Sequence, residues 1–211
     1  MWKWLIGLFL IGGLLVCAGG LGGSGWWYWQ RLQVERQATE AAQLARVQQE
    51  EAANALTIAT AARSDALAIA RAAVAAGDDR SAIDAFGEVL DGEPQNVEAL
   101  LGRGRALARL ERTTEAETDL RALVQLQPDN AEALEALAWV LGRSGQDAEA
   151  VTTLDALIKL TPNDPKAYRD RANAAFRAGN LTEARADAAR SCALGLTEGC
   201  ALEERLRAVR R

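Results

Sequence analysis

The sequence predicts an all-α fold, an array of helix pairs that repeats every 34 residues. Pro94, Pro128 and Pro162 recur at that interval, and such a period is typical of helical repeats. Small residues keep the same step in two columns, and larger apolar residues keep it in two others. The small columns are Ala82, Ala116, Ala150, Ala184 and Ala70, Gly104, Ala138, Ala172; the large ones are Phe86, Leu120, Leu154 and Val89, Leu123, Leu157. Paired helices are therefore expected to pack closely at the small residues and to bury the large ones.

With these columns, and with Asn96, Asn130 or Asp164 closely following each proline, the pattern resembles the tetratricopeptide repeat family. The resemblance implies a right-handed αα-solenoid of four repeats, at residues 63–96, 97–130, 131–164 and 165–198. The fourth copy has Leu196 in place of the proline and Ser191 at a usually apolar position, so the array is expected to end there. Residues 199–211 place Leu202, Leu206 and Val209 on one face, which predicts a helix that caps the exposed end.

Composition argues against several functions. The chain has no histidine, which removes the commonest general base near neutral pH and most zinc sites. It has no phosphate loop and no paired-cysteine metal spacing, and the fragment Gly102-Arg103-Gly104 is explained by helix packing. A net charge of −5 disfavours nucleic acid as a partner. We therefore expect no enzymatic activity, no metal and no cofactor.

The N-terminus predicts a transmembrane helix within residues 1–30, in contact with a lipid bilayer through residues 4–29. Leu5 to Leu21 is apolar or glycine throughout, a length of about 17 residues that reaches the lower limit of a membrane span. Tryptophans flank the run at both ends, as expected for side chains that prefer the headgroup region. The prediction is a single-pass protein of a bacterial inner membrane.

Alternatives to this helix are a cleaved secretory signal, with cleavage near Val16-Cys17-Ala18, and a lipid attached to Cys17. Residues 31–62 follow without glycine or proline and are rich in helix-forming side chains, which predicts a helical stalk or linker. Ser64 or Asp65 could cap the first repeat helix and so interrupt it.

Cys192 and Cys200 lie between the last helix of the fourth repeat and the expected capping helix. Their segment resembles the disulfide-bridged helical repeats of the SEL-like family, in which such a pair, with a glycine before the second cysteine, joins adjacent helices. The resemblance implies a disulfide, and structural disulfides are typical of oxidising compartments. This favours a periplasmic location for the repeats. The alternative is two reduced cysteines in a helical core.

In the resembled family, the first helix of each repeat lines a concave groove that holds peptides. The positions expected to face this groove are Arg71, Arg105, Arg109, Trp139, Arg143, Arg169, Asn173 and Arg177. Guanidinium groups donate paired hydrogen bonds to carboxylates, and indole supplies apolar contact area. The set therefore predicts an acidic protein or peptide partner. The alternative is a solvated face whose arginines pair with Glu98, Glu132 and Glu135.

Three functions remain open from the sequence. The first is a membrane-anchored interaction scaffold that binds a segment of an envelope protein in its groove. The second is a structural subunit of a membrane complex, assembled through its transmembrane helix and stalk. The third is a periplasmic chaperone-like protein with broad clients and weak dependence on the groove arginines.

Overall fold

The computed structural model describes residues 23–209, which contain nine α-helices. The helices are α2 Gly23–Ala76, α3 Asp79–Gly92, α4 Val97–Arg109, α5 Thr113–Leu126, α6 Ala131–Arg143, α7 Asp147–Leu160, α8 Pro165–Arg177, α9 Leu181–Ala193 and α10 Thr197–Ala208. The chain divides into two compact units, one up to residue 59 and one from residue 60 onward. Each unit is described separately below.

The first unit contributes residues 23–59, which lie in the N-terminal part of α2 and have exposed side chains along almost their whole length. Apolar side chains such as Leu44, Leu56 and Ile58 are more than 60% exposed. They are separated by charged and amide side chains, so no continuous apolar stripe forms along this part of the helix.

The predicted transmembrane helix and inner-membrane location are corrected by the structure. Within residues 23–209, no helix combines the length and the hydropathy that a bilayer crossing requires. Helix α2 is long enough, but Arg31, Glu35, Arg36 and Glu40 interrupt its apolar residues. Helices α3 to α10 have 12 to 14 residues each, against about 20 for a span. The apolar run at residues 5–21, on which the prediction depended, lies outside the described residues.

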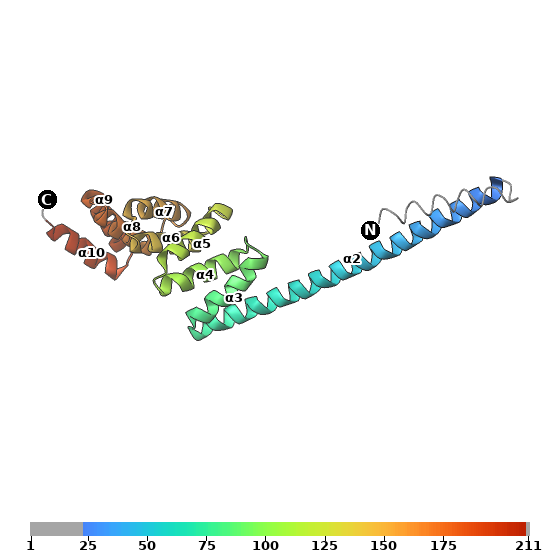
Figure 1. Cartoon of the computed structure of the whole chain (residues 1–211). Coiled ribbons are helices and arrows are strands. Elements are labelled where there is room, and N and C mark those ends of the chain that lie inside the picture. The colour runs from blue at the N-terminus through green and yellow to red at the C-terminus, as the bar shows by residue number, and fades with distance from the viewer. Residues whose placement is uncertain (1–22, 210–211) are drawn as a thin grey trace, which may run out of the picture. The chain divides into compact units, whose positions relative to one another are not determined.

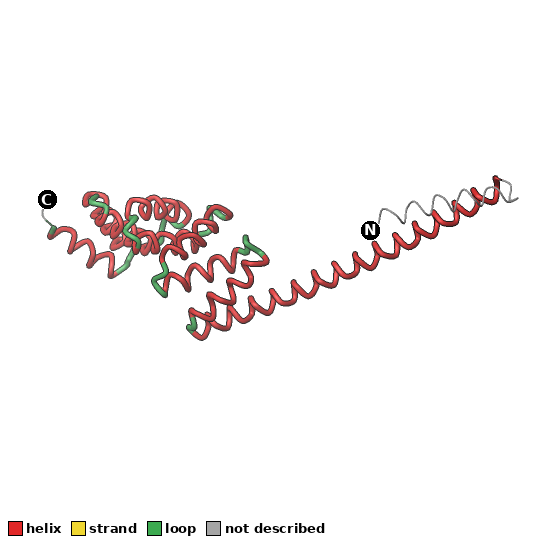
Figure 2. The backbone as a smooth tube through the Cα atoms, in the orientation of Figure 1, coloured by secondary structure: helices red, strands yellow, loops and turns green. Residues whose placement is uncertain are grey.

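The second unit is a solenoid of helix pairs (Figure 1). Helices α4 and α5, α6 and α7, and α8 and α9 pack as pairs, and each pair packs on the next. Short turns join the helices (Figure 2). The residue two places after each repeated proline is the N-cap of the following helix: the side chains of Asn96, Asn130 and Asp164 accept hydrogen bonds from its first amides. This satisfies donors that a helix start leaves free.

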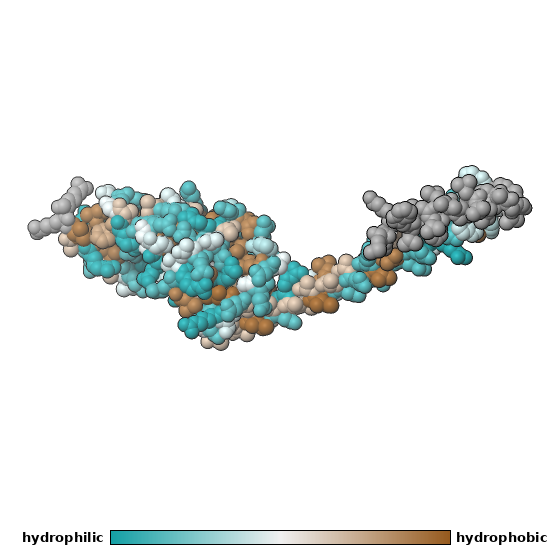
Figure 3. Space-filling view, in the orientation of Figure 1, coloured by the Kyte–Doolittle hydropathy of each residue, from teal (hydrophilic) through white to brown (hydrophobic). Residues whose placement is uncertain are grey.

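The small-residue columns lie where helices meet. Ala82, Ala116, Ala150 and Ala184 are completely buried, and so are Leu120, Leu123 and Leu141 of the larger set. Gly104 must be small, because a Cβ atom there would lie 2.9 Å from Leu120 Cγ. Elsewhere the visible surface of this unit is mainly hydrophilic, with separate apolar patches (Figure 3).

Helix α10 covers the end of the array. Leu202 and Leu206 are buried in a small core with Ala172, Ala175, Ala184 and Ala188 of helices α8 and α9. Ser191 is fully buried, and its hydroxyl donates a 2.7 Å hydrogen bond to the carbonyl oxygen of Pro165. A polar residue is therefore accommodated at this otherwise apolar column. Cys192 and Cys200 are joined by a disulfide between α9 and α10, with a Cα–Cα distance of 4.4 Å.

One turn contains a strained residue. Gly77, Gly145 and Gly179 occupy equivalent turns at φ between +74° and +86°, a region that glycine adopts without steric cost. The fourth member of this column is Glu111, at φ +60°. A side chain in this conformation costs roughly 1–2 kcal/mol. Its presence asks for a compensating role.

We expect Glu111→Gly to stabilise the chain by about 1 kcal/mol, because it removes this strain while losing only an exposed ion pair. Guanidinium unfolding followed by far-UV circular dichroism measures the change. Glu111→Ala is the matched control, since it loses the same carboxylate but keeps the strained backbone. Equal stability of the two variants would contradict the prediction.

Candidate functional site

The candidate site is a groove over helices α4, α6 and α8, made of two adjoining hollows. The first, of about 300 Å³, is lined by Arg105, Ala108, Arg109, Glu135, Ala136 and Trp139. The second, of about 290 Å³, is lined by Glu135, Ala138, Trp139, Gly142, Arg143, Leu154, Arg169, Asp170, Asn173, Ala174 and Arg177. These hollows bring together every predicted groove residue except Arg71, which lies in α2.

Trp139 is the central side chain of the groove. It lines both hollows together with Glu135, which lies one turn earlier on α6. Its side chain is 50% exposed, although a large indole is usually much more deeply buried. Arg143 lies against it, with the guanidinium carbon 5.6 Å from the ring centroid. An exposed aromatic side chain between two hollows is typical of a binding surface.

Each predicted groove arginine forms an ion pair within the chain. The pairs are Arg71 with Glu98 at 2.5 Å, Arg105 with Glu132 at 3.0 Å, Arg109 with Asp79 at 2.5 Å, Arg143 with Glu111 at 2.6 Å, Arg169 with Asp170 at 2.7 Å and Arg177 with Asp147 at 2.7 Å. Five of the six pairs join different helices or turns, so they hold neighbouring elements together. The positive charge of the groove is thus compensated by carboxylates of the chain itself.

The ion pairs follow the repeat until Trp139. Arg71 with Glu98 and Arg105 with Glu132 are the same contact in successive repeats. One repeat further on, these positions are Trp139 and Lys166, so an aromatic residue replaces the arginine and the carboxylate is lost. The groove therefore changes character at α6, from ion pairs to an exposed indole.

Comparison with known proteins gives the family. Tetratricopeptide repeat models match residues 67–131 and 107–170. The chain belongs to the tetratricopeptide repeat family. Such repeats mediate protein–protein interaction. No curated protein matches this sequence.

Solved tetratricopeptide structures have the same fold. MamA of Desulfovibrio magneticus RS-1 is 20% identical, with a TM-score of 0.66 over 69% of this chain and 84% of that one. A tetratricopeptide repeat protein of Parabacteroides merdae is 19% identical, with a TM-score of 0.61 over 69% of this chain and 60% of that one. A further one, from Thermus thermophilus, is 18% identical, with a TM-score of 0.54 over 68% of this chain and 80% of that one. At these identities the likeness establishes the fold.

Two carboxylates of these tetratricopeptide ion pairs have shifted pKa values. The hydrogen bonds from Arg71 lower the pKa of Glu98, so this carboxylate stays ionised and paired near neutral pH. Burial in the second hollow raises the pKa of Asp170, and the adjacent Arg169 opposes that rise. The wall of the groove at α8 thus contains a carboxyl group whose charged form is disfavoured by its surroundings.

The sequence also contained signals for carboxylates that were not predicted as part of the site. Asp79 and Asp147 are 68 residues apart, as are their partners Arg109 and Arg177. Position 113, midway between the two aspartates, is a threonine, and Arg143 instead pairs with Glu111 in the preceding turn. This recurrence at twice the repeat length could have identified the first two pairs; nothing in the sequence indicates the third.

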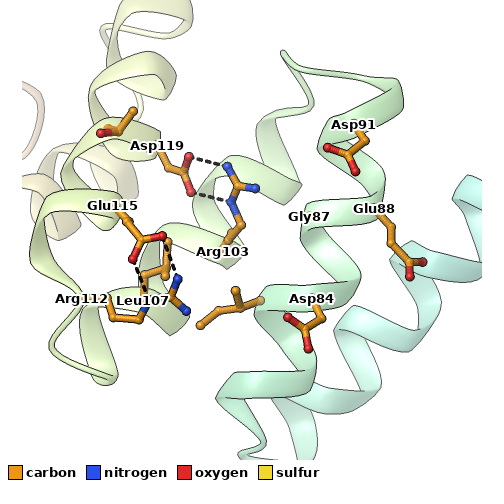
Figure 4. A pocket seen from close by; sticks show the side chains of 11 residues that line it. Asp84, Gly87, Glu88, Asp91, Arg103, Leu107, Arg112, Glu115 and Asp119 are labelled. Carbon is orange, nitrogen blue, oxygen red and sulfur yellow. Dashed lines mark hydrogen bonds and ion pairs between the residues drawn. The ribbon is translucent and has the colours of Figure 1, made fainter.

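A separate cleft of about 530 Å³ lies among α3, α4 and α5 (Figure 4). At its wall, Arg103 donates to both carboxylate oxygens of Asp119 at 2.8 Å. Two repeats later, Arg171 makes the same contact with Asp187 and a further one with Asp155. The residue of the first repeat equivalent to Asp155 is Gly87, so the cleft occupies space that a side chain fills in the third repeat.

Proposed function

We propose that this chain is an interaction scaffold that holds a segment of a partner protein in the groove over α4, α6 and α8. The observation that carries the proposal is Trp139, half exposed between two hollows where the neighbouring repeats have ion-paired arginines. Binding energy at protein interfaces is concentrated in such aromatic side chains, which bury a large area at little entropic cost.

The rigidity of the groove supports the same function. Its helices are fixed by buried apolar columns and by ion pairs that cross from one repeat to the next. A preformed surface loses little conformational entropy when a ligand binds. A segment can therefore be bound without rearrangement of the repeats.

Site-specific photocrosslinking in cells tests the proposal. A photoreactive amino acid at position 136, in the first hollow, is expected to give a discrete adduct with a partner whose crosslinked segment mass spectrometry identifies. Trp139→Ala should abolish the adduct, because the groove then lacks its aromatic contact. Trp27→Ala removes an exposed tryptophan of α2 and should leave the adduct unchanged. Adducts that persist in Trp139→Ala would contradict binding in the groove, and a broad set of them would favour chaperone-like holding of many clients.

A further inference from the structure

We infer that the segment bound in this groove places an apolar side chain against Trp139 and, beside it, a lysine or arginine against Glu135. The inference rests on the function proposed above and names the chemistry of the partner. It replaces the acidic segment that the arginines alone predicted with a segment that is apolar and basic.

The first step of the argument concerns charge. The five arginines that line the two hollows are each within 3.0 Å of a carboxylate of the chain. An acidic ligand would have to displace these carboxylates, and each displaced carboxylate would lose its partner. The attraction expected of a row of free guanidinium groups is therefore absent from this surface.

The second step concerns Glu135. Among the described charged residues that line the two hollows, Glu135 is the one without an ion pair, and its side chain is exposed. It lies four residues before Trp139 on α6, so the two side chains project from the same helical face. A ligand that contacts the indole has its neighbouring side chain within reach of this carboxylate. A basic side chain satisfies that carboxylate, whereas an acidic one is repelled by it.

The third step concerns the first hollow. Its lining includes Ala108, Ala136 and the indole of Trp139. Arg105 and Arg109 also line it, with their guanidinium groups bound to Glu132 and Asp79, and arginine stems are themselves apolar. The hollow therefore offers apolar contact with few unsatisfied donors, which suits an aliphatic or aromatic side chain.

The fourth step explains the strain at Glu111. Its carboxylate binds Arg143, and Arg143 in turn lies against Trp139. Strained backbone that persists in a structure is found preferentially where it positions functional groups. Glu111 is accordingly a positioning residue that holds Arg143 at the indole and limits the conformations of the binding surface before the ligand arrives.

A random peptide library displayed on phage, selected on the full chain and counter-selected on Trp139→Ala, tests the inference. The expected enrichment is a motif with an apolar residue next to lysine or arginine. An enriched peptide, synthesised with a fluorophore, should bind Trp139→Ala at least about tenfold more weakly. Glu135→Gln should weaken binding about threefold, and the loss should vanish when the basic residue of the peptide is changed to glutamine.

Glu88→Gln is the matched control, because it removes the same charge from α3 at the separate cleft and should not change the affinity. Trp139-dependent peptides that are enriched in acidic residues, or a Glu135→Gln variant with unchanged affinity, would overturn the inference and leave the groove function standing. Failure to enrich any Trp139-dependent peptide would overturn both. The two proposals are thus separately testable.

Discussion

Replacing Arg171 by alanine is expected to destabilise the repeat unit by about 3–5 kcal/mol, because it leaves a buried carboxylate without its partner. Arg171 donates to both oxygens of Asp187, at 2.7 and 2.8 Å, and to Asp155 at 2.6 Å. The Asp187 side chain is 7% exposed. Hydrogen bonds to Asp187, and secondarily to Asp155, raise the pKa of Arg171 above its ordinary value. Guanidinium unfolding of the full chain measures the loss.

The same pair can be removed without this loss if both members are replaced. One repeat earlier, the equivalent positions are Leu137 and Thr153, so this fold already accepts an uncharged pair there. The double variant Arg171→Leu, Asp187→Thr is expected to recover most of the stability, to within about 1 kcal/mol of the native chain. If the double variant is as unstable as Arg171→Ala, the destabilisation comes from lost packing and not from the unpaired charge.

Much of the fold was predictable because each repeat solves the same packing problem. A residue in a contact between two helices is restricted to small side chains, and the restriction recurs every 34 residues, as in the column that contains Ala116 and Ala150. The polar residues after the prolines recur for an equally local reason, since each caps a helix. Such constraints act within one repeat and therefore remain legible in the sequence.

The predicted site was less accurate because ion pairing depends on positions in other repeats. The sequence places Arg109 and Arg143 on the expected helices, and the structure adds that Asp79 and Glu111 already bind them. These partners are 30 and 32 residues away along the chain. Two of the three carboxylates considered from sequence, Glu98 and Glu132, do form ion pairs, whereas Glu135 does not. Whether an arginine is free for a ligand is a property of the assembled repeats.

Replacing both Cys192 and Cys200 by serine is expected to destabilise the C-terminal end of the array by about 2.5 kcal/mol, from the entropy of closing an eight-residue loop. In a repeat array each unit is stabilised by its neighbours alone, so the effect should be local. Helix α10 buries Leu202 and Leu206 on α8 and α9, and its detachment would expose that small core.

Native-state hydrogen exchange distinguishes this local effect from a general one. Amides of α9 and α10 are expected to lose protection in the double-serine variant, while amides of α4 and α5 keep theirs. Adding a thiol reductant to the native chain should reproduce the pattern, and adding it to the variant should change nothing. Equal protection of α10 in all samples would mean that Leu202, Leu206 and the close contact of Gly199 with Ser191 suffice to hold the helix. The end of this solenoid would then be fixed by packing, with the disulfide contributing little to its stability.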